Sequence, residues 1–306
     1  MTIDIENVYK RLNRIIPSGQ LLLNEPMKNH TSFRIGGPAD ILVLPANEEE
    51  IVHTLNVCNA FSVPIFVMGN GSNLLVRDKG IRGIVLKISE NYNQIEIYDK
   101  LIKAQSGILM STLSKAAVKN SLKGLEFANG IPGTLGGAVT MNAGAYGGEM
   151  KSVVSRVKAV DPMGNFHHLK LEDMEFGYRT SCIQTNNMIV LEVDLELEYG
   201  DKQESRSLMA DLARRRREKQ PLSYPSAGST FKRPVGYYAG KLIQDCGLKG
   251  LRIGEAQISE LHAGFIINLG NATAQNVIDL IKKVQEIILD KYGVEMVPEV
   301  RIIGEE

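Results

Sequence analysis

The sequence lacks an excess of charge of either sign. Its 306 residues include 35 Lys and Arg and 35 Asp and Glu, so the formal net charge at pH 7 is zero. This balance is not typical of a dedicated nucleic-acid-binding protein, although it leaves room for a local basic patch. The sequence also lacks any uncharged apolar run near the roughly 20 residues that span a bilayer. We therefore expect no nucleic-acid partner and no membrane span.

Cysteine and histidine are scarce as well. The three cysteines, Cys58, Cys182 and Cys246, are odd in number and widely spaced, which does not indicate a disulfide framework or a zinc site. The five histidines form no HExxH or similar cluster. Residues 1–16 predict an amphipathic helix rather than a signal peptide. These features predict no bound metal and a reducing, cytoplasmic location.

Strand-like and helical segments alternate irregularly, which favours an α+β fold over a regular βαβ series. The composition changes near residue 200, where a highly charged helix begins, so we predict one domain over 1–200 and a second over 201–306. The predicted helices cover 47–61, 110–120, 201–220, 237–247 and 274–292. The predicted strands cover 39–45, 64–69, 83–89, 187–197, 263–269 and 299–303, with a hairpin at 93–107 turning at Asp99 and Lys100 and another at 152–171.

Glycine is concentrated in the stretch GIPGTLGGAVTMNAGAYGG at 130–148, which holds seven of the 29 glycines. Each glycine costs about 0.5–1 kcal/mol relative to alanine inside regular structure, so this stretch must need a backbone that is bare and free to adopt unusual angles. A second glycine loop, GNGSN, occupies 69–73. Backbone N–H groups in such loops can converge on a phosphate oxygen, which a Cβ atom would obstruct. We interpret the long stretch, called here the glycine tract, as a phosphate-binding loop, whereas GNGSN alone is equally compatible with a tight turn.

Both glycine loops depart from the common nucleotide-binding motifs. Leu74 stands where GxGxxG needs its third glycine, and the residues after it are strand-like rather than helical. The glycine tract contains no GK[ST], with which a P-loop ends. A Rossmann fold and a P-loop are therefore both disfavoured.

Seven motifs follow one another along nearly the whole chain. They are TSFRIGGPAD (31–40), GNGSNLLVRD (69–78), GIPGTLGGAVTMNAGAYGGEM (130–150), FGYRTS (176–181), AGSTFKRP (227–234), AGKLIQDCGLKGLRIGEAQISELHAGFIIN (239–268) and PEVRIIGE (298–305). Each alone is a weak signal, but as an ordered set they are specific. On these motifs the sequence resembles the UDP-N-acetylenolpyruvoylglucosamine reductase family, also called the UDP-N-acetylmuramate dehydrogenases. The short stretch after YRTS is similar to the branch of that family that lacks an inserted tyrosine loop.

The resemblance implies a fold and a cofactor. The family has a two-part FAD-binding domain of the vanillyl-alcohol-oxidase type, here expected over 1–200, and a C-terminal α+β substrate-binding domain, here expected over 201–306. FAD would be bound non-covalently, with its pyrophosphate wrapped by the two glycine loops. The implied cofactor-binding residues are Arg34, Gly69, Asn70, Gly71, Ser72, Asn73, Leu74, Gly130, Ile131, Pro132, Gly133, Gly136, Gly137, Met141, Asn142, Gly144 and Ala145.

The resemblance also implies a reaction. NADPH would reduce UDP-N-acetylglucosamine enolpyruvate to UDP-N-acetylmuramate, a precursor of bacterial peptidoglycan, in a monomeric cytoplasmic enzyme. Hydride would pass from NADPH to flavin N5 and then to the terminal carbon of the enolpyruvyl group, which leaves negative charge on the neighbouring carbon and its carboxylate. Such a step needs a cation and hydrogen bonds directed at that charge, and an acid that protonates the carbon.

Three residues would carry this chemistry by their positions in the family motifs. Ser229 would be the proton donor, Arg179 the cation that holds the substrate carboxylate, and Glu299 a group that polarises the enolate region or assists proton transfer. From the residues alone, each has an ordinary alternative. Ser229 in a Gly/Pro loop would be a turn former, and Arg179 a surface ion-pair partner. Glu299 and Arg301 would be exposed neighbours on one strand face.

The implied substrate-binding residues are Tyr178, Arg214, Lys219 and Arg301. Arg214 represents the run of four arginines at 214–217, one of which would attract the substrate diphosphate. Lys219 would help to stabilise the Ser229 alkoxide. Two other functions compete with the reductase: a flavin-dependent alcohol or lactone oxidase, and a nucleotide-binding module without catalysis.

Overall fold

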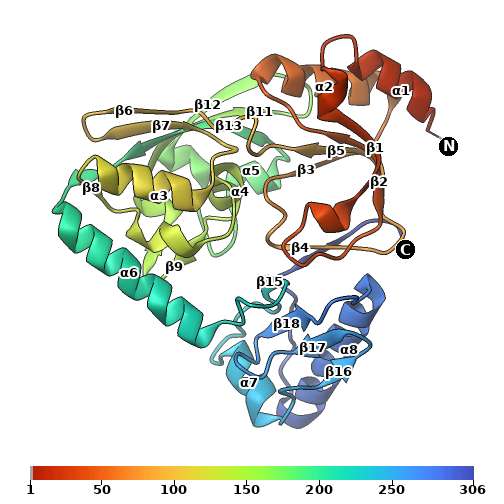
Figure 1. Ribbon diagram of the computed structural model, residues 1–306, viewed down its shortest axis with the longest axis vertical. Coiled ribbons are helices and arrows are strands. Elements are labelled where there is room, and N and C mark those ends of the chain that lie inside the picture. The colour runs from red at the N-terminus through yellow and green to blue at the C-terminus, as the bar shows by residue number, and fades with distance from the viewer. Residues whose placement is uncertain (1–2) are drawn as a thin grey trace. The chain divides into compact units, whose positions relative to one another are not determined.

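The computed structural model describes residues 3–306, which divide into two compact units (Figure 1). Unit 1 combines the chain up to Leu23 with Ile41–Asn70 and Gly83–Arg215. Unit 2 combines Asn24–Asp40, Gly71–Arg82 and Arg216–Glu306. Each unit is therefore built from segments that are distant in sequence, and the domain boundary near residue 200 stays a prediction.

A five-stranded antiparallel sheet forms the centre of unit 1, in the order β12-β11-β13-β7-β6. Both predicted hairpins are confirmed within it, and the first turns at Asp99 and Lys100 because Tyr98 pairs with Leu101. The strands are β6 Ile95–Tyr98, β7 Leu101–Gln105, β11 Val154–Val160, β12 Phe166–Lys170 and β13 Ile189–Glu196.

Short helices cover one face of this sheet and enclose the largest core of unit 1 (Figure 1). Their apolar residues recur at helical spacing, as with Met110, Leu113 and Ala117, which are all buried. The long charged helix α6 buries little of its length, and Ser205 fixes it by donating from Oγ to the buried Glu126 carboxylate at 2.6 Å. The elements are α3 Met110–Lys119, β8 Leu122–Lys123, η3 Glu126–Gly130, α4 Leu135–Thr140, β9 Gly144–Ala145, β10 Gly148–Glu149, η4 Met150–Ser152, η5 Leu171–Met174, α5 Cys182–Thr185, β14 Glu198–Tyr199 and α6 Lys202–Lys219.

A second sheet, in the order β1-β2-β5-β3, packs with the N-terminal helices. Asn47 caps α2 as its sequence position predicts, because its side chain accepts a hydrogen bond from Glu50 N at 2.9 Å. The predicted helix over 1–16 is shorter in the structure, and its first two residues lie outside the described residues. The elements are α1 Ile5–Leu12, η1 Ser18–Gln20, β1 Leu21–Pro26, η2 Met27–Asn29, β2 Pro38–Val43, α2 Glu48–Phe61, β3 Ile65–Met68 and β5 Ile81–Lys87.

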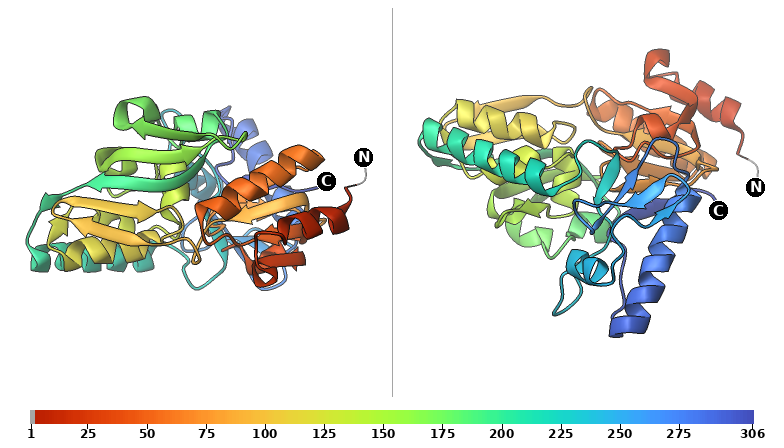
Figure 2. Two further views of the ribbon diagram at one scale, coloured as in Figure 1. Left: turned by 90° about the horizontal axis from the view of Figure 1, so that it is seen from above. Right: turned by 60° about the horizontal axis from the view of Figure 1, so that its bottom comes forward.

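Unit 2 contains a four-stranded sheet in the order β15-β18-β17-β16, against which the long helix α8 packs (Figure 2). The amphipathic pattern predicted for 274–292 is confirmed, since α8 buries one face in the core of unit 2. Asp78 caps the start of α8 by accepting hydrogen bonds from Ala274 N at 2.8 Å and Gln275 N at 3.1 Å. The elements are β4 Leu74–Val76, β15 Ser226–Ser229, α7 Ala239–Asp245, β16 Arg252–Ile253, β17 Ala256–Ile258, β18 Phe265–Asn268, α8 Ala274–Tyr292 and β19 Arg301–Ile303.

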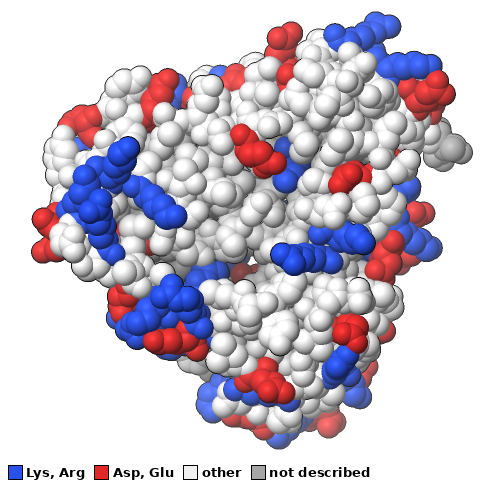
Figure 3. All heavy atoms as spheres, in the orientation of Figure 1, with Lys and Arg blue, Asp and Glu red and all other residues white. Residues whose placement is uncertain are grey.

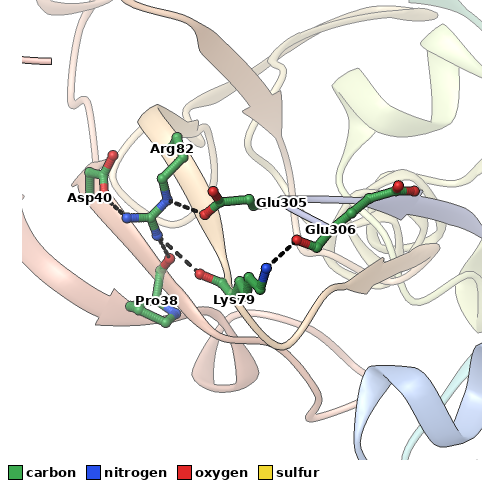
Figure 4. A network of polar contacts seen from close by, with 6 residues as sticks. All are labelled: Pro38, Asp40, Lys79, Arg82, Glu305 and Glu306. Atoms are coloured by element: carbon green, nitrogen blue, oxygen red, sulfur yellow. Dashed lines mark hydrogen bonds and ion pairs between the residues drawn. The ribbon is translucent and has the colours of Figure 1, made fainter. Parts of the chain in front are cut away.

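The last strand, β19, pairs in parallel with β4, so that Arg301 lies beside Leu74. Beyond it, Arg82 joins three segments of unit 2 (Figure 4). Its guanidinium contacts the Asp40 carboxylate and donates to Lys79 O at 3.1 Å, and its Nε lies 3.5 Å from a Glu305 carboxylate oxygen. These contacts hold the segment after β19 to the chain that follows β4.

Charged side chains of both signs are interspersed over the face shown in Figure 3, apart from a group of Lys and Arg at the α3 and β8 end of unit 1. No helix among residues 3–306 is long and apolar enough to cross a membrane. The same residues contain no group of three or more His, Cys, Asp or Glu side chains arranged to hold a metal ion.

Candidate active site

The two glycine loops meet inside unit 1. A Cβ atom on Gly69 would lie 2.1 Å from Thr134 Oγ1, so only glycine allows this approach. The neighbouring Asn70 donates from Nδ2 to Pro132 O at 3.1 Å. The start of GNGSN and the start of the glycine tract therefore lie side by side.

Close approach of neighbouring atoms, rather than an unusual backbone angle, explains three of the seven glycines of the tract, Gly136, Gly144 and Gly148. All seven of its glycines are described, and Gly147 alone has a positive φ, of 88°. A Cβ atom on Gly136 would lie 2.8 Å from Ser106 Cβ, and one on Gly148 would lie 2.5 Å from the Phe127 ring. The expectation that the tract needs unusual angles was therefore wrong for most of its glycines, whereas the expectation of a bare backbone is confirmed at Gly136, Gly144 and Gly148.

A buried hydroxyl group lies where the two loops meet. Thr134 is 1% exposed, and its Oγ1 has no hydrogen-bond partner among residues 3–306. A buried polar atom without a partner is rare in a folded protein and indicates a missing ligand or water. This hydroxyl, beside the glycine backbone at Gly69, suits a group rich in hydrogen-bond acceptors, such as the pyrophosphate of FAD. Sequence analysis missed Thr134, although a hydroxyl residue among glycines is the signal that could have indicated it.

The motif FGYRTS forms a tight turn in unit 1. Gly177 N donates to Thr180 O at 3.1 Å and Thr180 N donates to Gly177 O at 3.4 Å, which leaves Tyr178 and Arg179 at the tip. Arg179 has φ 58°, a left-handed conformation that costs a non-glycine residue about 1–2 kcal/mol. The Arg179 guanidinium lies 5.4 Å from the centre of the Tyr178 ring, and that ring is 63% exposed. Strain of this kind is commonly retained at functional sites.

Ser229 is the last residue of strand β15, so the expectation that it lies in a loop was wrong. The Ser229 side chain is exposed, while the next residue, Thr230, is buried. Thr230 N donates to Gly264 O at 2.8 Å, and its Oγ1 accepts from Ile266 N at 3.2 Å. The buried neighbour thus anchors the backbone from which Ser229 projects.

Glu299 lies beside this strand end in unit 2. Glu299 N donates to Thr230 O at 2.8 Å, and Glu299 O accepts from Asn73 Nδ2 at 3.2 Å. Asn73 O in turn accepts from Arg301 N at 3.0 Å. The backbone therefore brings Ser229, Glu299 and Asn73 together. We expected Glu299 and Arg301 to share a strand, but β19 begins only at Arg301, because Asn73 and Thr230 take the backbone bonds of Glu299.

The other predicted cofactor-binding residues of unit 2 lie in segments that contact or follow the GNGSN loop. Ser32 N donates to Gly71 O at 3.2 Å, which ties the loop of Gly71 and Ser72 to the TSFR motif. Arg34 in that motif has φ 55°, and Asn268 donates from Nδ2 to Phe33 O at 3.1 Å. Leu74, also expected to contact the cofactor, has its side chain buried at the start of β4.

The charged candidates of helix α6 have ordinary surface environments. Arg214 lies 2.6 Å from a carboxylate oxygen of Asp211, and Arg215 lies 2.7 Å from the other oxygen. Lys219 is exposed at the last residue of the helix. A substrate contact by Arg214 and assistance to Ser229 by Lys219 both stay predictions.

His262 supports the strand end that carries Ser229. Its Nδ1 accepts from Gly264 N at 3.1 Å, and its ring meets the Phe265 ring edge to face at 4.9 Å between ring centres. Burial, and to a lesser extent the charge of Lys249, lowers the pKa of His262 below its ordinary value of 6.5.

We expect the free energy of unfolding to fall as the pH drops below about 6.5. The pKa of His262 is lower in the folded than in the unfolded chain, so the unfolded chain binds this proton first and gains stability from it. The contribution of neutral His262 is complete above pH 6.5 and is lost as the pH falls through the folded pKa. Urea unfolding at pH 7.5, 6.5 and 5.5 measures this effect, and His262→Gln should make the dependence weaker. If the free energy of unfolding fell equally with pH in the wild type and in His262→Gln, the pH dependence would come from groups other than His262.

The fold and the glycine loops together define the class of protein. The family model described as "FAD binding domain" matches residues 39–170. A solved structure of p-cresol methylhydroxylase is similar in fold, with a TM-score of 0.51 and 13% sequence identity over 98% of this chain and 67% of that one. The protein is an α+β protein with an FAD-binding domain and a second α+β region.

Proteins that are more similar in sequence show the family to which the chain belongs. The model described as "UDP-N-acetylenolpyruvoylglucosamine reductase, C-terminal domain" matches residues 220–303. The chain is 54% identical over 298 residues to the UDP-N-acetylenolpyruvoylglucosamine reductase of Alkaliphilus oremlandii, covering 97% of this chain and 98% of that one. It is also similar to the crystal structure of the corresponding reductase from Thermus caldophilus, with a TM-score of 0.78 and 37% identity over 92% of this chain and 97% of that one. The chain belongs to the UDP-N-acetylenolpyruvoylglucosamine reductase family.

Proposed function

We propose that this protein reduces UDP-N-acetylglucosamine enolpyruvate to UDP-N-acetylmuramate with NADPH as the electron donor. The product would serve bacterial peptidoglycan synthesis, and the enzyme would act as a cytoplasmic monomer. The observation that carries the proposal is a chain of two hydrogen bonds next to Ser229, from the Asn73 side chain in the GNGSN loop to Glu299 O and from Glu299 N to Thr230 O. This arrangement supports a role for the GNGSN loop, the Glu299 carboxylate and the Ser229 hydroxyl in one active site.

FAD, held non-covalently, supplies a hydride acceptor that NADPH can reduce and that can pass the hydride to the terminal enolpyruvyl carbon. Thr134 would donate from its buried Oγ1 to the pyrophosphate of FAD, since this hydroxyl lacks a partner among the described residues, and backbone N–H groups of the GNGSN loop would donate beside it. Asn70 would keep the two glycine loops together through its bond to Pro132 O. The other predicted residues of the two loops, apart from the Asn142 side chain, and Arg34 would line the cofactor.

Arg179 would hold the carboxylate of the enolpyruvyl group. Its planar guanidinium can donate two parallel hydrogen bonds to a carboxylate, and its charge opposes the negative charge that develops beside that carboxylate. Arg179 lies at the tip of the left-handed turn, where it is half-buried beside the exposed Tyr178. Tyr178 would contact the substrate through its exposed ring.

Ser229 would give its Oγ proton to the carbon next to the carboxylate, while the terminal carbon receives the hydride. The new C–H bond forms as the Ser229 O–H bond breaks, so the hydroxyl needs stabilisation of its alkoxide. Lys219 would provide positive charge, and Glu299 would polarise the enolate region or assist proton transfer. Arg301 and Arg214 would bind other parts of the substrate, including its diphosphate.

The visible spectrum of the purified protein without oxygen tests the whole proposal. Addition of NADPH should bleach the yellow flavin, and addition of UDP-N-acetylglucosamine enolpyruvate should restore it. Bleaching without recovery by this substrate would exclude the proposed acceptor, and rapid recovery by oxygen alone would favour an oxidase. Protein that stays colourless with added FAD would favour a nucleotide-binding module without catalysis.

A further inference from the structure

Asn142 occupies a backbone position that usually requires glycine. It follows helix α4 with φ 42°, and the helix ends with two bonds, from Asn142 N to Val139 O at 3.1 Å and from Ala143 N to Ala138 O at 2.8 Å. This pair of bonds is the Schellman ending of a helix, in which glycine is the common left-handed residue and asparagine an occasional one. Glycine is common in this tract and would fit this position. The asparagine side chain is therefore expected to have a role of its own.

The Asn142 carboxamide is buried and fully engaged with protein groups. It is 3% exposed, and its Nδ2 donates to Gly177 O at 3.2 Å and to Glu149 Oε2 at 3.1 Å. Its Oδ1 accepts from Lys151 N at 2.9 Å. Both N–H donors and the carbonyl oxygen are thus used, and the donor at Lys151 fixes which end is the oxygen. The side chain is directed at the turn of Gly177 rather than available to a ligand.

Both flanks of the Tyr178–Arg179 turn are tied to the end of helix α4. Gly177 O accepts from Asn142, while on the other side Ser181 Oγ donates to Thr140 O at 2.8 Å. The turn itself contains the left-handed Arg179 and is closed by the two bonds between Gly177 and Thr180. A strained two-residue turn of this kind persists when the surrounding structure holds it in place.

We propose that Asn142 is a positioning residue that holds the Tyr178–Arg179 turn, so that the Arg179 guanidinium is presented to the substrate carboxylate. Glu149 orients the carboxamide through a charge-assisted hydrogen bond, and Asn142 transmits that orientation to Gly177 O. This inference rests on the proposed function of Arg179. It also assigns the Asn142 side chain to the turn rather than to direct contact with FAD.

Asn142→Gly is the informative variant, because glycine keeps the left-handed helix end and removes only the carboxamide. We expect reoxidation of the bleached flavin by UDP-N-acetylglucosamine enolpyruvate to slow by about tenfold in single turnover. In an Arg179→Ala background the same substitution should change this rate by less than about twofold, because its effect passes through Arg179. The dissociation constant of FAD, from flavin fluorescence, should change less than the rate. Asn187→Gly, at an exposed left-handed asparagine with φ 52°, is the matched control.

An equal loss of rate in both backgrounds, or an unchanged rate in Asn142→Gly, would overturn the inference. Backbone hydrogen exchange gives a readout that does not depend on the reaction. Asn142→Gly should raise exchange at Gly177 and Thr180, whereas Asn187→Gly should not, and unchanged exchange at the turn would also overturn the inference. If the wild-type flavin is not reoxidised by the substrate at all, the proposed function fails, while the exchange experiment still decides whether Asn142 holds the turn.

Discussion

Ser229→Ala should slow reoxidation of the reduced flavin by the enolpyruvyl substrate by about 10²–10⁴, while NADPH still reduces the flavin at close to the normal rate. The loss equals the usual contribution of a positioned general acid, and alanine removes only the hydroxyl. The fold should tolerate the change, because Ser229 is exposed and Thr230 carries the buried contacts of this strand end. Stopped-flow spectroscopy measures flavin reduction by NADPH and flavin reoxidation by the enolpyruvyl substrate separately.

The nearby Ser223→Ala is a matched control, since Ser223 is exposed in the loop that leads to β15. It should leave both half-reactions unchanged. If Ser229→Ala slowed both half-reactions equally, the serine would not be the specific proton donor, and a disturbed cofactor site would be the better explanation.

Arg179→Lys should lower kcat/KM for the enolpyruvyl substrate by about 10², similar to the loss of a donor to a developing oxyanion. Lysine keeps the charge but cannot form the paired hydrogen bonds of a guanidinium. Steady-state kinetics with the full substrate measure the effect, and flavin reduction by NADPH should be little changed. Arg206→Lys on the exposed face of α6 provides the same substitution away from the turn. Near-normal turnover in Arg179→Lys would contradict the proposed role.

Local patterns predicted most helices and strands of the protein. The turn at Asp99 and Lys100, the cap at Asn47 and the amphipathic stripe of α8 depend on neighbouring residues, so the sequence contains the physical causes. Contacts between residues that are distant in the sequence could not be predicted in this way. Nothing near Glu299 in the sequence indicates that Thr230 and Asn73 take its backbone bonds, and this is why its expected strand begins two residues late.

At the candidate site, the glycine tract is a second example of contacts that the sequence does not predict. Its composition predicted a bare backbone, but not what approaches it. The neighbours are Ser106 at Gly136 and Phe127 at Gly148, and Thr134 of the tract in turn approaches Gly69 of the GNGSN loop. The link from Asn142 to Gly177 is likewise invisible in the sequence, because asparagine at a helix end is ordinarily explained by its backbone preference alone.

The pairing of β19 with β4 has a consequence for folding during synthesis. Asn73 and Leu74 are made early, but their backbone partners, Glu299 and Arg301, are made among the last residues of the chain. A ribosome-bound chain therefore carries an unpaired β4 edge until the final segment emerges, and closing such a distant contact is slow because of its loop entropy. Flavin capture on the ribosome should thus come late, and until β19 emerges the β4 edge is open to pairing with another chain.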